Sequence, residues 1–116
     1  MKQKLELDDW DMLSYVLAGA CHDVGHPGFN NIYLIERNDP IAIRYNDMSV
    51  LENFHVATTF EILNNEKYNI FSELSKTEYK RVRKQIIGAI LATDMALHFQ
   101  KIGILKGKLE NDEDQE

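Results

Sequence analysis

An uncharged stretch that ends in a histidine–aspartate pair constrains this chain more than any other feature of its sequence. No residue from Val16 to Cys21 is charged, His22 and Asp23 follow directly, and His26 stands just before a Pro-Gly dipeptide. Imidazole nitrogen and carboxylate oxygen suit zinc and harder divalent ions as ligands. The stretch therefore predicts a helix end at which polar side chains gather. They form either a metal site or an ordinary polar helix terminus.

The residues before the pair predict a helix that begins after Asp8. Aspartate is a common N-cap residue, and acidic side chains in the first turn interact favourably with the positive end of the helix dipole. Because the remaining faces are largely uncharged, we expect the helix to be buried on all sides. Gly25 and the following proline should end it near Val24. Apolar residues recur along it at helical spacing: Trp10, Leu13, Leu17, Ala20 and Val24.

This interpretation places His22 and Asp23 where a helix leaves the protein interior. A buried carboxylate without a partner is unfavourable, so Asp23 needs one, and a metal ion is one good candidate. His26 would lie at the same helix mouth.

Composition favours a small helical domain, or part of one. The 116 residues have 44% hydrophobic content, enough for one modest core, and only 2 prolines and 6 glycines interrupt them. The net charge of -6 argues against nucleic acid as a partner. A single cysteine cannot form an internal disulfide. We expect no membrane segment or signal peptide and a cytoplasmic location, or the cytoplasmic face of a membrane if the full-length protein is anchored.

The rest of the chain also reads as helical. Short helices are predicted over residues 30–36 and 41–43. Ser49 and Glu52 have the spacing of a capping box for a helix that runs to about residue 64. Ser75 and Glu78 repeat that spacing before a long helix. Its apolar face is predicted from helical periodicity: Tyr79, Val82, Ile86, Ala89, Ile90 and Thr93.

Charged residues outside these faces receive simpler interpretations. The basic residues between positions 80 and 84 are predicted to be a solvated face. Asp94 and His98 are four residues apart, which allows a side-chain pair if the helix continues. Residues 110–116 are strongly acidic and are predicted to be a disordered tail.

Three blocks of sequence, at residues 22–33, 45–55 and 91–98, contain all four histidines of the chain. The first reads His-Asp, an apolar residue, any residue, His, then Gly and Asn at fixed offsets. In this pattern, and in the order and spacing of the blocks, the chain resembles class I cyclic nucleotide phosphodiesterases. The resemblance covers most of residues 13–100.

The resemblance implies a compact all-α, multi-helix bundle of the phosphodiesterase (HD-domain) type, built around two divalent ions, zinc plus magnesium or manganese. Residues 8–106 would be a central part of the catalytic domain, residues 1–7 its N-terminal end and residues 107–116 an acidic tail. The implied activity is hydrolysis of cyclic AMP, cyclic GMP or both to the 5′-monophosphate in signal transduction.

The resemblance also assigns roles to residues. His22 and Asp23 would be metal ligands, with Asp23 contacting both ions. His26 would be catalytic, close to the hydroxide that attacks phosphorus. Glu52 would act in catalysis by holding a water of the second metal, and Thr93 would hold another. The remaining assigned residues would bind substrate or support the ligands: Asn31, His55, Asp94 and Met95.

The sequence departs from the family pattern in several places. The upstream His-Asn-x-x-His block, which supplies the general acid and a zinc ligand, is missing, as are a downstream aspartate ligand and a base-reading glutamine. The chain therefore resembles a middle portion of the domain, expected to be inactive alone. Gly25 replaces a common aspartate, and Phe54 stands where many members have histidine.

Two other functional interpretations stay open. The chain could be a non-catalytic helical interaction module that associates with a partner or with itself through exposed apolar faces. It could also be another His-Asp metal phosphohydrolase, although the blocks around Glu52 and Thr93 argue against this. For Glu52 itself, the capping role remains an alternative to a role at the metals.

Overall fold

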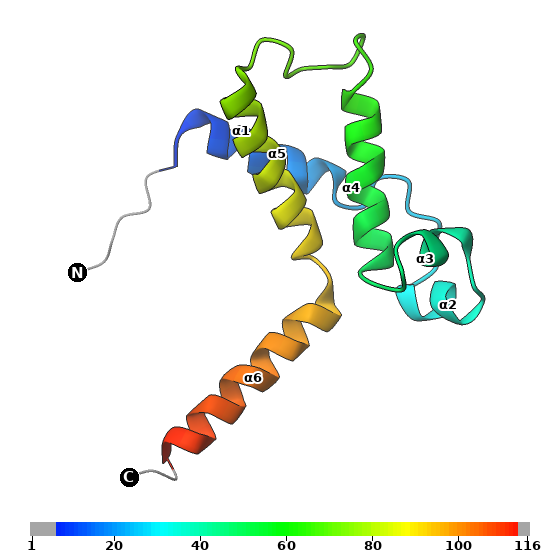
Figure 1. Ribbon diagram of the computed structural model, residues 1–116, viewed down its shortest axis with the longest axis vertical. Coiled ribbons are helices and arrows are strands. Elements are labelled where there is room, and N and C mark those ends of the chain that lie inside the picture. The colour runs from blue at the N-terminus through cyan, green and yellow to red at the C-terminus, as the bar shows by residue number, and fades with distance from the viewer. Residues whose placement is uncertain (1–6, 114–116) are drawn as a thin grey trace.

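The computed structural model describes residues 7–113 and contains six helices and no strand within that range (Figure 1). The all-helical class predicted from the sequence is confirmed. Residues 1–6, most of the predicted N-terminal end, lie outside the described residues. The helices are α1 (Asp9–Cys21), α2 (Asn31–Glu36), α3 (Pro40–Arg44), α4 (Val50–Leu63), α5 (Lys76–Leu91) and α6 (Met95–Glu113).

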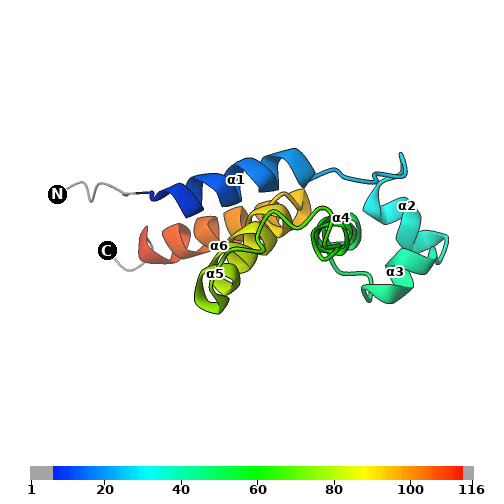
Figure 2. The ribbon, with the colours of Figure 1, turned by 90° about the horizontal axis from the view of Figure 1, so that it is seen from above.

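Two apolar clusters hold the helices together. In the larger one, α5 packs against both α1 and α4. Val82, Ile86 and Ile90 of α5, which belong to the predicted apolar face, are fully buried there. The prediction is wrong at the two ends of that face, because Tyr79 is 38% exposed and Thr93 lies beyond the end of the helix. The smaller cluster joins α2 and α3 to the start of α4 around Leu34 and Ala42. Figure 2 shows the α2–α3 pair at one end of the molecule, beyond α4.

The start of α1 is fixed by charge as well as by packing. Asp8 caps the helix in a reciprocal capping box with Asp11, which confirms the predicted cap. Arg81 of α5 pairs with both aspartates, at 2.8 Å from Asp8 and 2.6 Å from Asp11. Hydrogen bonds to Asp11, foremost that from the Gln85 side chain, lower the pKa of its carboxyl below the ordinary value. The predicted solvated basic face therefore contributes Arg81 to a helix–helix contact.

The prediction that α1 is buried on all sides is wrong. Its buried residues are Asp11, Ser14 and Ala18, which lie on one face. Val16, by contrast, is 64% exposed, and Met12 and Tyr15 beside it are exposed as well. Periodicity identifies which residues can be buried, but it does not supply the element that covers them, and within residues 7–113 only α5 and α4 pack against this helix.

The end of α1 also differs from the prediction. The helix stops at Cys21, three residues before the predicted end at Val24. The backbone then turns twice, with Val24 N–H donating to Cys21 and His26 N–H donating to Asp23. Gly25 follows in the left-handed region at φ 70°. This turn carries Asp23 and His26 off the helix.

The two Ser-x-x-Glu boxes behave differently. Ser75 and Glu78 form the predicted reciprocal capping box at the start of α5. Ser49 also precedes its helix, but its side chain makes no capping hydrogen bond, so the predicted box at α4 is wrong. The partners that replace it come from distant parts of the chain and are described below.

The helix α6 projects from the rest of the structure and packs against no other described helix (Figure 1). It continues through residues 110–113, so the predicted disorder of the acidic tail is wrong there, and residues 114–116 lie outside the described range. The radius of gyration is 17.9 Å, compared with about 13 Å for a compact domain of this length. The predicted compactness is therefore not found. Within residues 7–113, none of the helices has the length and apolar character to span a bilayer.

Truncating one core side chain tests this packing. Ile86→Ala should reduce the free energy of unfolding by about 2–5 kcal/mol, because it leaves a cavity between α1, α4 and α5. The matched change Ile104→Ala on α6, where the side chain is 61% exposed, should alter it by less than about 0.5 kcal/mol. Urea unfolding followed by circular dichroism measures both values. Equal losses in the two variants would show that α6 is packed.

Candidate metal centre and adjoining cavity

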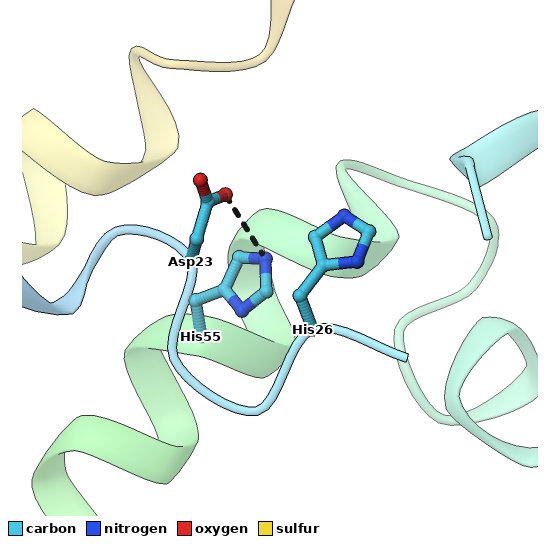
Figure 3. Close-up of side chains that lie close together, drawn as sticks. All are labelled: Asp23, His26 and His55. Carbon is cyan, nitrogen blue, oxygen red and sulfur yellow. Dashed lines mark ion pairs between the residues drawn. The ribbon is translucent and has the colours of Figure 1, made fainter. Parts of the chain in front are cut away.

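Three potential ligands come together where the loop after α1 meets α4 (Figure 3). Asp23 and His26 lie on the loop, and His55 projects from α4. One potential ligand atom from each lies within 4.8 Å of those from the other two. The rings of His26 and His55 are stacked with their centroids 5.6 Å apart.

Two histidines are oriented through backbone carbonyl groups. Nδ1 of His55 lies 2.7 Å from the carbonyl oxygen of Val24, and Nδ1 of His22 lies 2.7 Å from that of Gly19. A carbonyl oxygen can only accept, so each Nδ1 carries the proton and donates it. In the neutral ring, Nε2 then presents a free lone pair, which is the arrangement of most metal-binding histidines.

Both free nitrogens face the carboxylate of Asp23. Nε2 of His22 is 3.1 Å from Oδ2, and Nε2 of His55 is 3.9 Å from Oδ1. With neutral rings, all of these atoms are hydrogen-bond acceptors and repel one another unless a cation lies among them. The cation is either a proton on an imidazole or a metal ion. The chemistry of these donors suits a divalent ion, and Asp23 and His55 belong to the group whose ligand atoms all lie within 4.8 Å of one another, whereas His22 meets only Asp23.

His26 differs from the other two histidines. The backbone N–H of Gly28 donates to its Nδ1 at 2.9 Å, so Nδ1 is the acceptor. The neutral ring must then carry its proton on Nε2, which makes that atom a donor rather than a ligand. His26 is thus suited to donate a hydrogen bond to an oxygen bound beside the cluster.

An open cavity of about 520 Å³ adjoins the cluster, and His26 lines both. Glu52, Thr93 and Asp94 form much of its polar wall, while Phe29, Ile32 and Met95 supply apolar surface. These residues come from the α1–α2 loop, from the α5–α6 connection and from the starts of α2, α4 and α6. The cavity therefore lies where three separate parts of the chain converge.

Asn31 binds the start of α4 at two points. Its side-chain amide donates to Oε1 of Glu52 at 2.7 Å, and its Oδ1 accepts from the backbone N–H of Leu51 at 2.9 Å. The second bond satisfies an N–H in the first turn of α4, which is the function of a capping residue. Asn31 therefore caps α4 in place of the predicted Ser49, and it also orients Glu52.

The opposite wall of the cavity is fixed by Asp94. Its two carboxylate oxygens accept from the Ser49 hydroxyl at 2.6 Å and from the backbone N–H of Ala96 at 2.9 Å. The predicted side-chain pair between Asp94 and His98 is absent from the described residues, where only a backbone hydrogen bond joins the two. Thr93 donates its hydroxyl proton to the Ile90 carbonyl, which leaves its oxygen free to accept.

The idea that His22 and Asp23 emerge from a buried interior is wrong for the described structure. Their side chains are 47% and 65% exposed, because α1 ends early and only one of its faces is covered. Among the histidines it is His55, 2% exposed, that is buried. The buried partner of Asp23 therefore lies on α4, more than thirty residues along the chain.

The two departures from the family pattern within the blocks touch each other. A side chain at position 25 would bring its Cβ to 3.2 Å from the Phe54 ring, and Gly25 also holds φ at +70°. That contact is closer than most carbon pairs tolerate, so Phe54 occupies the space beside Gly25. The glycine and the phenylalanine are compatible with each other and constitute one local change.

The structure gathers most of the residues that the sequence singles out. His22 contacts Asp23, and His26, Asn31, Glu52, Thr93, Asp94 and Met95 line one cavity. His55, which sequence reasoning placed among the supporting residues, occupies the cluster itself. Its spacing from Glu52 and Thr59, which places the three residues along one polar face of the helix, was the available signal.

The sequence model of the 3′5′-cyclic nucleotide phosphodiesterase family matches residues 1–116, the whole chain. The chain belongs to this family. The resemblance noted from the three blocks is thereby confirmed.

Individual relatives support the same family. A human protein named high affinity cGMP-specific 3′,5′-cyclic phosphodiesterase 9A is 46% identical over 101 residues, which cover 87% of this chain and 17% of the relative. The dual 3′,5′-cyclic-AMP and -GMP phosphodiesterase beta of Plasmodium falciparum is 42% identical over 97 residues, covering 84% and 8%. A 3′,5′-cyclic-nucleotide phosphodiesterase of Dictyostelium discoideum is 40% identical over 101 residues, covering 87% and 13%. The chain thus spans less than a fifth of the length of these relatives.

Proposed function

We propose that this chain is part of a metal-dependent phosphodiesterase that hydrolyses a 3′,5′-cyclic nucleotide to the 5′-monophosphate. The observation that carries the proposal is the position of Asp23 between two imidazole nitrogens that face it as acceptors. Family membership supports the reaction class, and the names of the relatives support cyclic AMP or cyclic GMP as the substrate.

The proposed ligands of the first ion are His22, Asp23 and His55, with zinc favoured by the two imidazoles. The second ion, magnesium or manganese, would be served through water by Glu52 and Thr93, whose free oxygens line the cavity. When bound, such ions polarise a phosphodiester and lower the pKa of water. Asp23 would contact both ions.

The other side chains would orient the substrate. His26 donates from Nε2 and can hold a phosphate oxygen or the attacking water. Asn31 keeps one carboxylate oxygen of Glu52 occupied, so the other is directed to the contents of the cavity. Met95 and Phe29 present apolar surface on which a nucleoside can rest. The roles of His26 and Asn31 follow from the hydrogen bonds that these side chains already make.

Removal of the central carboxylate tests the metal centre. Asp23→Ala should weaken Zn²⁺ binding by more than about a hundredfold, beyond the 10–100-fold effect of losing an outer partner. His98→Ala is the control, because this exposed histidine lies on α6 outside the cluster. Isothermal titration calorimetry at neutral pH gives both dissociation constants. Unchanged Zn²⁺ affinity in the Asp23 variant would remove the basis of the proposal.

A chimera tests the reaction itself. The chain offers few ligands for two ions, so we propose that it turns over cyclic nucleotide very slowly by itself. Its 101 matched residues, placed in the human relative instead of their counterparts, should support hydrolysis of a cyclic nucleotide with added Zn²⁺ and Mg²⁺. Asp23→Ala in the chimera should lower kcat/KM by more than about a hundredfold, and Lys80→Ala on exposed α5 surface should not. A chimera that folds and binds zinc but hydrolyses neither nucleotide would contradict the proposal.

As a second candidate, we propose that the chain is an interaction module that associates with a second copy through α6. This helix packs against no other described helix, and apolar side chains on it are exposed, among them Phe99, Ile104 and Leu105. Three lysines between residues 101 and 108 precede three acids between residues 110 and 113. Antiparallel pairing of two copies would place these opposite charges beside each other.

Sedimentation velocity distinguishes this candidate. The chain should form a dimer at micromolar concentration, and Leu105→Glu on α6 should convert it to a monomer, because a charge would be buried in the interface. Ile43→Glu, on equally exposed α3, should leave the dimer intact. A monomeric parent chain, or equal effects of the two substitutions, would exclude association through α6.

A further inference from the structure

We propose that Ser49 is a positioning residue that holds the base of α6, and with it one wall of the cavity, through Asp94. The inference concerns the arrangement of the cavity, and only its consequence for metal binding rests on the proposed function. The inference starts from the hydrogen bonds at the start of α4, where Asn31 rather than Ser49 caps the helix. The residue that precedes this helix does not cap it, and its hydroxyl reaches a residue 45 positions away.

The backbone at Ser49 indicates that this hydroxyl has a specific use. Ser49 lies in the left-handed region at φ 39°, which glycine adopts without steric cost. Asn46 and Asp47 in the same loop also have positive φ, but they are residue types that tolerate it. Serine is not, so its surroundings must hold this conformation, and the contacts of its side chain are one part of them. The only hydrogen bond of that side chain among the described residues goes to Asp94.

The capping function has moved to another residue. Asn31 accepts from the N–H of Leu51, so the first turn of α4 remains satisfied without the Ser49 side chain. Asn53 also binds the carbonyl groups of Met48 and Ser49, which fixes the loop from the other side. The serine hydroxyl is thereby free to donate to Asp94 rather than to take part in capping α4.

The acceptor of the bond, Asp94, lies at the base of α6. Asp94 is 8% exposed and ties the first turn of α6 through Ala96 N–H. No other described helix packs against α6, and within residues 7–113 no other side-chain hydrogen bond links its base to a distant segment. Besides the turn that joins α6 to α5, the bond between Ser49 and Asp94 is therefore the contact that bears on the direction of α6. Met95 and Ala96, the first residues of α6, line the cavity and move with it.

The test distinguishes the effect of losing the Ser49 hydroxyl from the effect of relieving the strain in its backbone. Ser49→Gly removes the hydroxyl but relieves the strain, so its thermal unfolding midpoint should equal or exceed that of the parent. Asn31→Ala, by contrast, should lower the midpoint, because α4 loses its cap. Ser72→Gly, at an exposed serine outside the cavity, is the matched control.

The direct readout is the distance between α4 and α6 in the full chain. Spin labels at Glu61→Cys and Lys101→Cys, in a Cys21→Ser background, should give one narrow distance distribution by pulsed electron paramagnetic resonance. Ser49→Gly should broaden it, and Ser72→Gly should not. A distribution that stays narrow in Ser49→Gly would overturn the proposal, whatever the protein binds.

Manganese binding then tests the link to function. Because Thr93 adjoins Asp94, Ser49→Gly should weaken Mn²⁺ affinity about tenfold or more, measured by the free Mn²⁺ signal. If Ser49→Gly broadens the distance distribution but leaves the Mn²⁺ affinity unchanged, the part of the proposal that links Ser49 to metal binding is overturned. If the parent chain binds no Mn²⁺ while the distances still respond to Ser49→Gly, the anchor of α6 stands and the proposed function fails.

Discussion

The site depends on the hydrogen bond between the buried imidazole of His55 and the backbone carbonyl of Val24. It joins α4 to the loop after α1 across 31 positions of sequence, at 2.7 Å. The bond fixes the tautomer of His55 and turns Nε2 toward Asp23. The loop itself is mostly exposed and holds two glycines at positive φ, so it has little packing of its own. This partly buried bond, with the stacking of His26 on His55 and the Phe54 ring beside Gly25, sets the position of the loop against α4 and hence that of the candidate metal cluster.

Around the cavity, side chains from distant segments make the hydrogen bonds that residues next to a helix end usually make. Asn31 caps α4 from α2, and Ser49 holds the base of α6 from α4. Both bonds are short and partly buried, which strengthens them relative to bonds in water. The arrangement links α2 and the start of α4, which also share the smaller apolar cluster, to α6, which packs against no other described helix. Polar bonds therefore join α6 to this cavity, whereas the larger core under α5 contributes most of the apolar packing of the fold.

The contrast between the two Ser-x-x-Glu boxes shows what the sequence can predict. The box at Ser75 forms because nothing else competes for its side chains, and the local pattern is sufficient. The box at Ser49 has the same spacing but fails, because Asn31 and Asp94 offer better partners 18 and 45 residues away. Likewise, the apolar face of α5 was predictable from its period. The covering of α1 was not, since periodicity does not say which element packs against an apolar face.

The residues of the candidate metal cluster were likewise predictable only in part. The His-Asp pair is visible in the sequence because its members are adjacent, but His55 enters the cluster only through the contact of α4 with α1 and α5. Metal binding at Asp23 would then bridge the end of α1 and the middle of α4. Binding to a site that exists only in the folded state stabilises that state. The same ion that serves the proposed chemistry would therefore favour the packing that brings its ligands together, and the exposed loop after α1 would be the segment that it orders.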